Sequence, residues 1–136
     1  MASIDASVKI TNGTALSGYI DIRGFVVVGL VTPAAWTAAD ITFQSCAQAA
    51  STVPGAGITG DPGVFYDLFT DQGVEVKIPT AGIPIGGGRF FAFNSVNFGS
   101  GAGLNVEYLK IRSGVTGVPV NQAADRVVTL VLATNR

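Results

Sequence analysis

The chain of 136 residues is long enough for one domain, in which a single core can bury about 70% of the unfolded surface. Only 12% of its residues are charged, against about 25% in typical soluble domains; its net charge is −1, and it has no histidine. These values exclude a basic surface for nucleic acid and catalysis by Ser-His-Asp or Cys-His arrangements. The lone Cys46 excludes an internal disulfide and a zinc site built from cysteines.

The low charge also bears on association. A surface with so few charges is poorly solvated on a free monomer, which predicts that the chain forms an oligomer or coats a larger assembly. A surface rich in Ser, Thr, Asn and Gln is the alternative explanation, and the chain has these residues in quantity.

Residues 1–16 form a polar lead with a brief alternation, in which Val8 and Ile10 oppose Ser7 and Lys9 before a turn signal at Asn12-Gly13. This pattern predicts either an edge strand or an N-terminal arm that reaches a neighbour. The first residues lack the basic and apolar regions of a signal peptide, and no apolar stretch is long enough to cross a bilayer. We therefore expect a protein made in the cytoplasm, with no export and no membrane partner.

Segments with strand chemistry then follow one another, separated by turn residues. They comprise residues 18–23, 25–31, 41–45, 64–69, 74–78, 89–94, 104–114 and 126–133. Two of them, 25–31 and 126–133, are apolar on both faces, as central strands are. The spacing predicts an all-β fold with almost no helix, namely a single domain (1–136) that forms an antiparallel two-sheet sandwich with about eight strands. The unequal loops and the absence of a Cys…Trp…Cys pattern favour the jelly-roll type over the alternative, an immunoglobulin-like sandwich.

Three segments depart from this simple pattern. Residues 33–40 are the only helix-like piece; Pro33 favours the first turn of a helix, which would have one or two turns at most. Residues 46–63 carry Asp61 as their only charge and are expected to form a long functional or mobile loop. In 104–114 the apolar set changes face after Tyr108, which requires a bulge, a strong twist or burial on both faces.

The clearest hairpin joins residues 64–69 to 74–78 through Thr70-Asp-Gln-Gly73, where Gly73 supplies a positive φ. Its second strand is expected to turn Val74, Val76 and Ile78 inward and its charged residues outward. Three carboxylates lie around this turn: Asp67, Asp71 and Glu75. Their spacing matches no calcium loop, and nothing selects them as a glycosidase pair, so we interpret them as a solvated turn. Cys46 is interpreted as a buried, inert thiol.

Aromatic and basic side chains are the remaining candidates for contact with a partner. Trp36, Tyr19, Tyr66 and Tyr108 could be core or interface anchors, or could stack on sugar rings. Arg112 and Arg126 flank a polar loop and could form interfacial or merely local ion pairs. The candidate partner-binding residues are Trp36, Tyr66, Tyr108, Arg112, Gln122 and Arg126.

Three patches of sequence carry a resemblance to a known family. They are Pro33-Ala-Ala-Trp36 with Ile41-Thr-Phe-Gln-Ser45, Tyr66-Asp-Leu-Phe69 with Asp71-Gln-Gly-Val-Glu-Val76, and Tyr108-Leu-Lys-Ile-Arg-Ser-Gly114 with Pro119-Val-Asn-Gln-Ala-Ala-Asp-Arg126. Together they resemble the jelly-roll cement, or decoration, proteins that coat the capsids of tailed and especially short-tailed bacteriophages. The resemblance covers roughly residues 17–132 in patches and leaves out the N-terminal lead and residues 46–63.

The resemblance implies a structural virion protein on the outer capsid surface, made in the host cytoplasm, that bridges neighbouring major capsid subunits. It implies that the chain also binds itself, as a homodimer rather than a trimer, and that it is not an enzyme and needs no cofactor or metal. The alternative is a carbohydrate-binding or receptor-binding β-sandwich, for which Trp36 and Tyr66 would hold the glycan.

Overall fold

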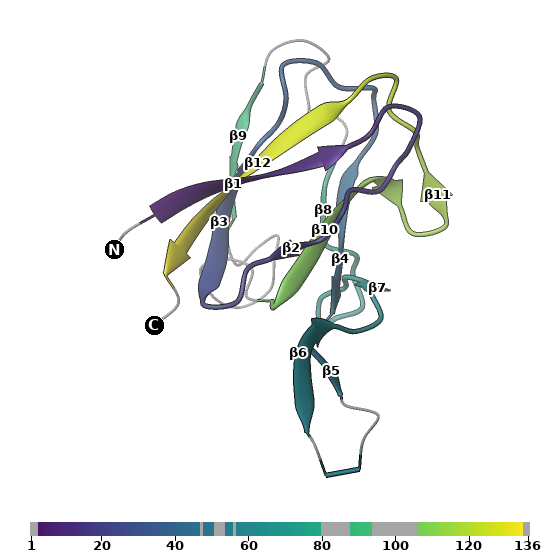
Figure 1. Ribbon diagram of the computed structural model, residues 1–136. Coiled ribbons are helices and arrows are strands. Elements are labelled where there is room, and N and C mark those ends of the chain that lie inside the picture. The colour runs from purple at the N-terminus through teal and green to yellow at the C-terminus, as the bar shows by residue number, and fades with distance from the viewer. Residues whose placement is uncertain are drawn as a thin grey trace.

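The computed structural model describes residues 3–46, 48–50, 54–55, 57–79, 88–93 and 106–134. This part of the chain contains strands and no helix, and it forms two antiparallel sheets with a small two-stranded extension (Figure 1). The predicted all-β, two-sheet antiparallel sandwich is therefore confirmed, while its jelly-roll type remains a prediction. Six of the twelve described strands have only two or three residues, so the sheets are built on a few long strands.

The first sheet has four strands in the order β1 (Ser3–Ile10), β12 (Arg126–Thr134), β3 (Phe25–Val31) and β9 (Phe90–Ala92). The first and last strands of the chain pair in an unbroken antiparallel register from Ser3 opposite Ala133 to Ile10 opposite Arg126. The N-terminal lead is thus an edge strand, one of its two predicted forms. β12 and β3, both apolar on two faces, are the inner strands, as predicted.

The second sheet has six strands arranged around two long ones. Its main path runs β11 (Val118–Pro119), β10 (Tyr108–Val115), β4 (Ile41–Cys46), β7 (Tyr66–Asp67), while β2 (Ile20–Asp21) pairs with β10 and β8 (Lys77–Ile78) with β4. β10 and β4 pair from Tyr108 opposite Cys46 to Ser113 opposite Ile41 without a register shift. Both strands therefore alternate in step between the core and the outer face of this sheet.

The hydrophobic core lies between the two sheets. Fully buried side chains come from both layers and from the connecting segments; they include Ile10, Ile22, Leu30, Trp36, Phe43, Leu109, Ile111 and Leu130. Each large apolar side chain of this kind contributes about 1.5–3 kcal/mol on burial. The Phe43 and Phe93 rings meet edge to face at 6.0 Å, the geometry that aromatic quadrupoles favour.

Burial on both faces explains the change of apolar face in the 104–114 segment. Leu109 and Ile111 point into the core, and Tyr108 and Arg112, on the opposite face, are only 2% and 7% exposed. No bulge is needed, because the pairing with β4 continues unbroken. The start of the predicted segment, residues 104–105, lies outside the described residues.

The predicted helical turn at 33–40 is wrong. The segment crosses the end of the sandwich in irregular backbone, and the Trp36 indole N–H donates to the Ala39 carbonyl at 3.1 Å. The Thr37 N–H donates to the Gln122 side chain at 2.8 Å, so it is not available to a helical carbonyl. Eight residues are too few to offset the cost of helix nucleation, and burial of Trp36 decides the local conformation instead.

Residues 46–63 also differ from the prediction, because their described part contains paired strands. β5 (Gln48–Ala50) and β6 (Ile58–Pro62) form a two-stranded arm that extends away from the sandwich (Figure 1). Gln48 lies opposite Pro62 and Ala50 opposite Ile58, with a register shift between the two pairs. Glycines at 55, 57 and 60 have positive φ, which side-chain-bearing residues rarely adopt and which strand propensity does not reveal.

Candidate partner-binding surface

A hairpin covering residues 64–78, here called the docking hairpin, folds onto one border of the six-stranded sheet. Its β7 pairs with Gln44 and Ser45 of β4, and its β8 pairs with Ile41 and Thr42. The turn closes through the Thr70 N–H to the Val74 carbonyl at 2.8 Å, and Gly73 has a φ of +77°, as predicted. The same strand of the sheet therefore holds both sides of the hairpin.

The docking hairpin is unusually apolar toward solvent. Val64 and Tyr66 are each 68% exposed, Val74 is 60% exposed and Phe69 is 44% exposed. Val76 and Ile78 are buried as predicted, but the inward placement predicted for Val74 is wrong. Val74 immediately follows the turn, where the tip of the hairpin pairs with itself through the Thr70–Val74 hydrogen bond and the Phe69–Glu75 bridge and does not pair with β4.

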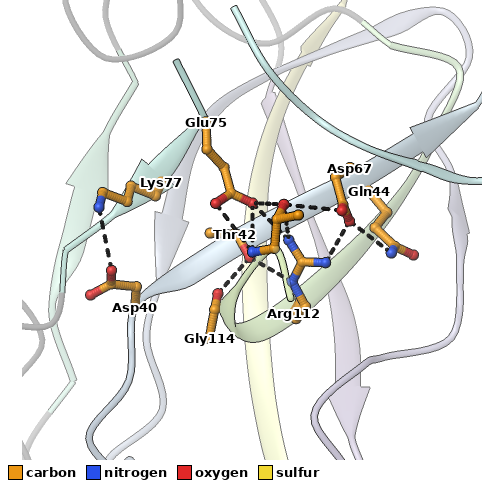
Figure 2. A network of polar contacts seen from close by, with 9 residues as sticks. Asp40, Thr42, Gln44, Asp67, Glu75, Lys77, Arg112 and Gly114 are labelled. Carbon is orange, nitrogen blue, oxygen red and sulfur yellow. Dashed lines mark hydrogen bonds and ion pairs between the residues drawn. The ribbon is translucent and has the colours of Figure 1, made fainter. Parts of the chain in front are cut away.

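The Arg112 side chain, from β10, contacts both Asp67 and Glu75 of this hairpin (Figure 2). Its guanidinium donates to Oδ1 of Asp67 and, at 2.7 Å, to Oε2 of Glu75, while its Nε donates to the Thr42 hydroxyl at 2.9 Å. The Arg112 side chain is 8% exposed, against 25% for Asp67 and 14% for Glu75. One nearly buried cation thus joins β10 to both sides of the hairpin. We call the set of Thr42, Asp67, Glu75, Arg112 and Thr116 the Arg112 network.

The turn between β10 and β11 completes the Arg112 network. The Thr116 hydroxyl lies 2.7 Å from Oε2 of Glu75 and 3.0 Å from Oδ2 of Asp67, and the Thr116 N–H donates to the Glu75 carboxylate. The Thr42 hydroxyl donates to the Gly114 carbonyl at 2.6 Å. Gly114, near the end of β10, has a φ of +105°, and a Cβ there would lie 2.4 Å from the Val118 carbonyl oxygen, so this position requires glycine.

The charges of the Arg112 network are paired and hydrogen-bonded to one another, as in an ion-pair network that stabilises a fold. Hydrogen bonds from the Gln44 amide, then from Arg112 and Thr116, lower the pKa of Asp67, although burial opposes this shift. Two carboxylates share one guanidinium, and each additional donor reduces the cost of removing them from water. Within the described part of the chain no group of three or more His, Cys, Asp or Glu side chains is placed to hold a metal ion.

An aromatic and cationic cluster lies where the arm joins the sandwich. The Tyr19 ring meets Tyr108 edge to face at 5.9 Å and lies 6.1 Å from Phe65. The Arg23 guanidinium is 5.2 Å from the Tyr108 ring centre, and Lys110 Nζ is 4.5 Å from that of Phe65, distances typical of cation–π contacts. The Tyr108 hydroxyl donates to the Gly60 carbonyl of β6. The cluster thus fixes the base of the arm.

The six predicted partner-binding residues are placed very differently. Tyr66 is exposed on the docking hairpin, whereas Trp36 and Tyr108 are 1% and 2% exposed. Gln122 is 1% exposed; its amide donates to the Ser113 hydroxyl at 2.6 Å and its carbonyl oxygen accepts from Arg126 Nε at 3.1 Å. Apart from Tyr66, these side chains make their contacts largely within the chain.

Other predictions from the sequence need correction at this surface. Of the three carboxylates near the hairpin turn, Asp67 and Glu75 form the Arg112 network, so they are not simply solvated. Cys46 is only partly buried. The exposed Val64 and Phe69 were missed, and the one available signal was the run of apolar residues on both faces of 64–69, which exceeds what an edge strand can bury.

No family model, curated protein or solved structure matches this chain. None of the described segments is a helix long and apolar enough to span a membrane.

Proposed function

We propose that this chain is a structural virion protein that decorates a bacteriophage capsid and cements it by bridging neighbouring major capsid subunits. The proposal combines the sequence resemblance to cement proteins with one structural observation, the arm that leaves the sandwich (Figure 1). The partners in this proposal are the major capsid protein and a second copy of the chain.

The arm supports the proposal because its two strands lack a neighbouring strand among the described residues. Among the described strands, β5 and β6 pair only with each other, and an isolated two-stranded hairpin is at best marginally stable in water. A surface that covers the arm would stabilise it. Residues 48–62 contain a single charge, Asp61, so a partner can cover them without removing many charges from water. An arm of this kind suits a groove on an assembled shell.

The docking hairpin supplies a second contact. Burial of its exposed apolar side chains by a partner would stabilise the complex by about 25 cal/mol per Å² of apolar surface. The Arg112 network holds the hairpin against the sheet, so little ordering is required on binding. Two contacts on different capsid subunits make the second binding event effectively intramolecular. Subunits joined in this way can separate only if one of the two contacts breaks.

A deletion at the tip of the arm tests the proposal. Ala50 and Ile58 lie opposite each other, so an Asn-Gly turn can replace residues 51–57 while retaining Gly60 and its contacts. The variant should keep the thermal stability of the sandwich and bind expanded capsid shells at least about tenfold more weakly. A matched control replaces Asn12 with Ala in the exposed turn after β1, outside both the arm and the docking hairpin. Unchanged shell binding by the deletion variant would refute the role of the arm.

Exposed aromatics favour a second candidate function, a carbohydrate-binding sandwich. Tyr66 and Tyr19 are 68% and 53% exposed, and rings of this kind can stack on sugars. The test is a glycan array probed with the wild type and with Tyr66→Ala. Loss of a specific glycan signal in the variant would support this function, and no retained glycan would remove it.

A further inference from the structure

One edge of β1 pairs with no other strand in the part of the chain that the structure describes. β1 is the end strand of the four-stranded sheet, and among the described residues its backbone hydrogen bonds run only to β12 (Figure 1). It is eight residues long, contains no proline, and pairs with β12 without a bulge. Natural sheets protect long edges with charged side chains, proline, bulges, inward-facing charges or a covering segment. Among the described residues, β1 is protected only by two charges of opposite sign, Asp5 and Lys9, and a second copy can pair these charges with each other.

The two faces of β1 differ in character. Ala6, Val8 and Ile10 face the core side together with Ile4, whereas Asp5, Ser7 and Lys9 alternate with them on the outer side. Ile4 is 48% exposed at the open edge. A strand added beside β1 would cover Ile4 and satisfy the free backbone groups.

We propose that this edge pairs with β1 of a second copy, antiparallel and centred on Ser7, to give a homodimer with one continuous sheet. A two-fold axis perpendicular to the sheet keeps each side chain on its own face, so a residue can lie opposite only a residue of the same parity. Centring on Ser7 places Asp5 of each copy opposite Lys9 of the other. It also places Ile4 opposite Ile10 and Ala6 opposite Val8.

The charges select this register over its neighbours. Pairing centred on Asp5 or on Lys9 would place like charges directly opposite each other, which destabilises a sheet. Pairing centred on Ala6 or Val8 would leave Asp5 and Lys9 opposite uncharged residues. Only the register centred on Ser7 gives two opposite-charge pairs. Within one copy Lys9 lies 3.9 Å from Asp125, and both side chains are 55% exposed, so this weak contact can be exchanged or extended in the dimer.

The inference rests on one part of the proposed function, the binding of a second copy, but it is tested on the free protein, so capsid binding can fail while the dimer stands. Charge variants provide a test because two defects should compensate each other. Asp5→Lys and Lys9→Glu each place like charges opposite one another in a homodimer, and each should raise the dissociation constant about tenfold or more. In a mixture of the two variants every cross-strand pair is again opposite in charge. Analytical ultracentrifugation should then show a heterodimer with about the wild-type affinity.

Cysteine cross-linking tests the register in a Cys46→Ala background. Ser7→Cys places two thiols opposite each other on the axis, at the roughly 4.5–5.5 Å Cα separation of paired strands, which a disulfide can span. Lys9→Cys is the matched control, because its two copies would lie about 14 Å apart along the strands. Mild oxidation should cross-link the first variant and not the second. A wild-type monomer at all concentrations, an unrestored mixture, or equal cross-linking of both cysteine variants would overturn the proposal.

Discussion

Replacing Arg112 with methionine would test whether the Arg112 network holds the docking hairpin. Methionine preserves much of the apolar stem but removes the cation between Asp67 and Glu75. Breaking a buried ion pair by removing one partner typically costs 3–5 kcal/mol. Water reaches both carboxylates here, with 25% and 14% of their side-chain surface exposed, so we expect a loss near the lower limit, about 3 kcal/mol.

The assay is equilibrium unfolding in urea together with thermal unfolding. For a chain of this length about 3 kcal/mol corresponds to a fall in Tm of about 12 °C. Arg23→Met is the matched control, because Arg23 contacts Asp21 at 2.6 Å with both side chains 42% exposed. An exposed pair of this kind contributes little to stability, so Arg23→Met should change the free energy of unfolding far less than Arg112→Met.

A rescue variant separates charge from packing. Adding Asp67→Asn and Glu75→Gln to Arg112→Met leaves no unpaired charge, so a substantial part of the lost stability should return. If Arg112→Met costs no more than Arg23→Met, the Arg112 network does not stabilise the hairpin and our reasoning is wrong.

Three further predictions follow from the same structure. Gly114→Ala should lower the free energy of unfolding in urea by about 3 kcal/mol or more, because the new Cβ would lie 2.4 Å from a backbone oxygen. Gly117→Ala, at a φ of +78° with open space around it, should lower it by about 1 kcal/mol. Similar losses for the two variants would contradict this explanation. Because the pKa of Asp67 is lowered in the folded protein, its contribution to stability is present above its unfolded pKa of about 3.9 and is lost as the pH falls through the folded pKa. Asp67→Asn should therefore flatten the acid side of the curve of stability against pH. An unchanged acid side would count against this contribution. Trp36→Ala should cost about 3–5 kcal/mol, whereas Tyr66→Ala should change the free energy of unfolding by less than about 0.5 kcal/mol and weaken shell binding; a stable Trp36→Ala variant would contradict the core assignment.

Local patterns in the sequence were sufficient to predict the all-β class and the inner strands. Residues 25–31 and 126–133 carry apolar side chains on both faces, and such strands have few places outside the middle of a sheet. The hairpin turn was equally predictable, because Gly73 adopts the positive φ that its position requires. These features depend on residues close together in the chain.

Features that depend on distant residues were not predictable from these patterns. Arg112 meets Asp67 and Glu75 across sequence separations of 45 and 37 residues, and nothing local links the three side chains. The sequence left open whether Arg112 forms interfacial or local ion pairs, and in the structure its pairs with Asp67 and Glu75 are local. Val74 shows the converse, since an apolar residue at the right spacing for the core lies exposed at the tip of the hairpin.

The helix predicted at 33–40 failed for a related reason. Pro33 and the alanines favour a turn of helix locally, but the Gln122 side chain, 85 residues away, accepts from the Thr37 N–H, and Trp36 is buried. Tertiary contacts of this kind outweigh helix propensity in a segment of only eight residues.

The central claim is that the chain binds an assembled capsid through its arm. The most direct test is co-sedimentation of the purified protein with the bacteriophage shells that the proposed function requires, before and after shell expansion. We predict saturable binding to expanded shells, weak binding to unexpanded shells, and loss of binding when residues 51–57 are replaced by the Asn-Gly turn. Absence of binding to either shell, with the wild-type protein folded, would contradict the account.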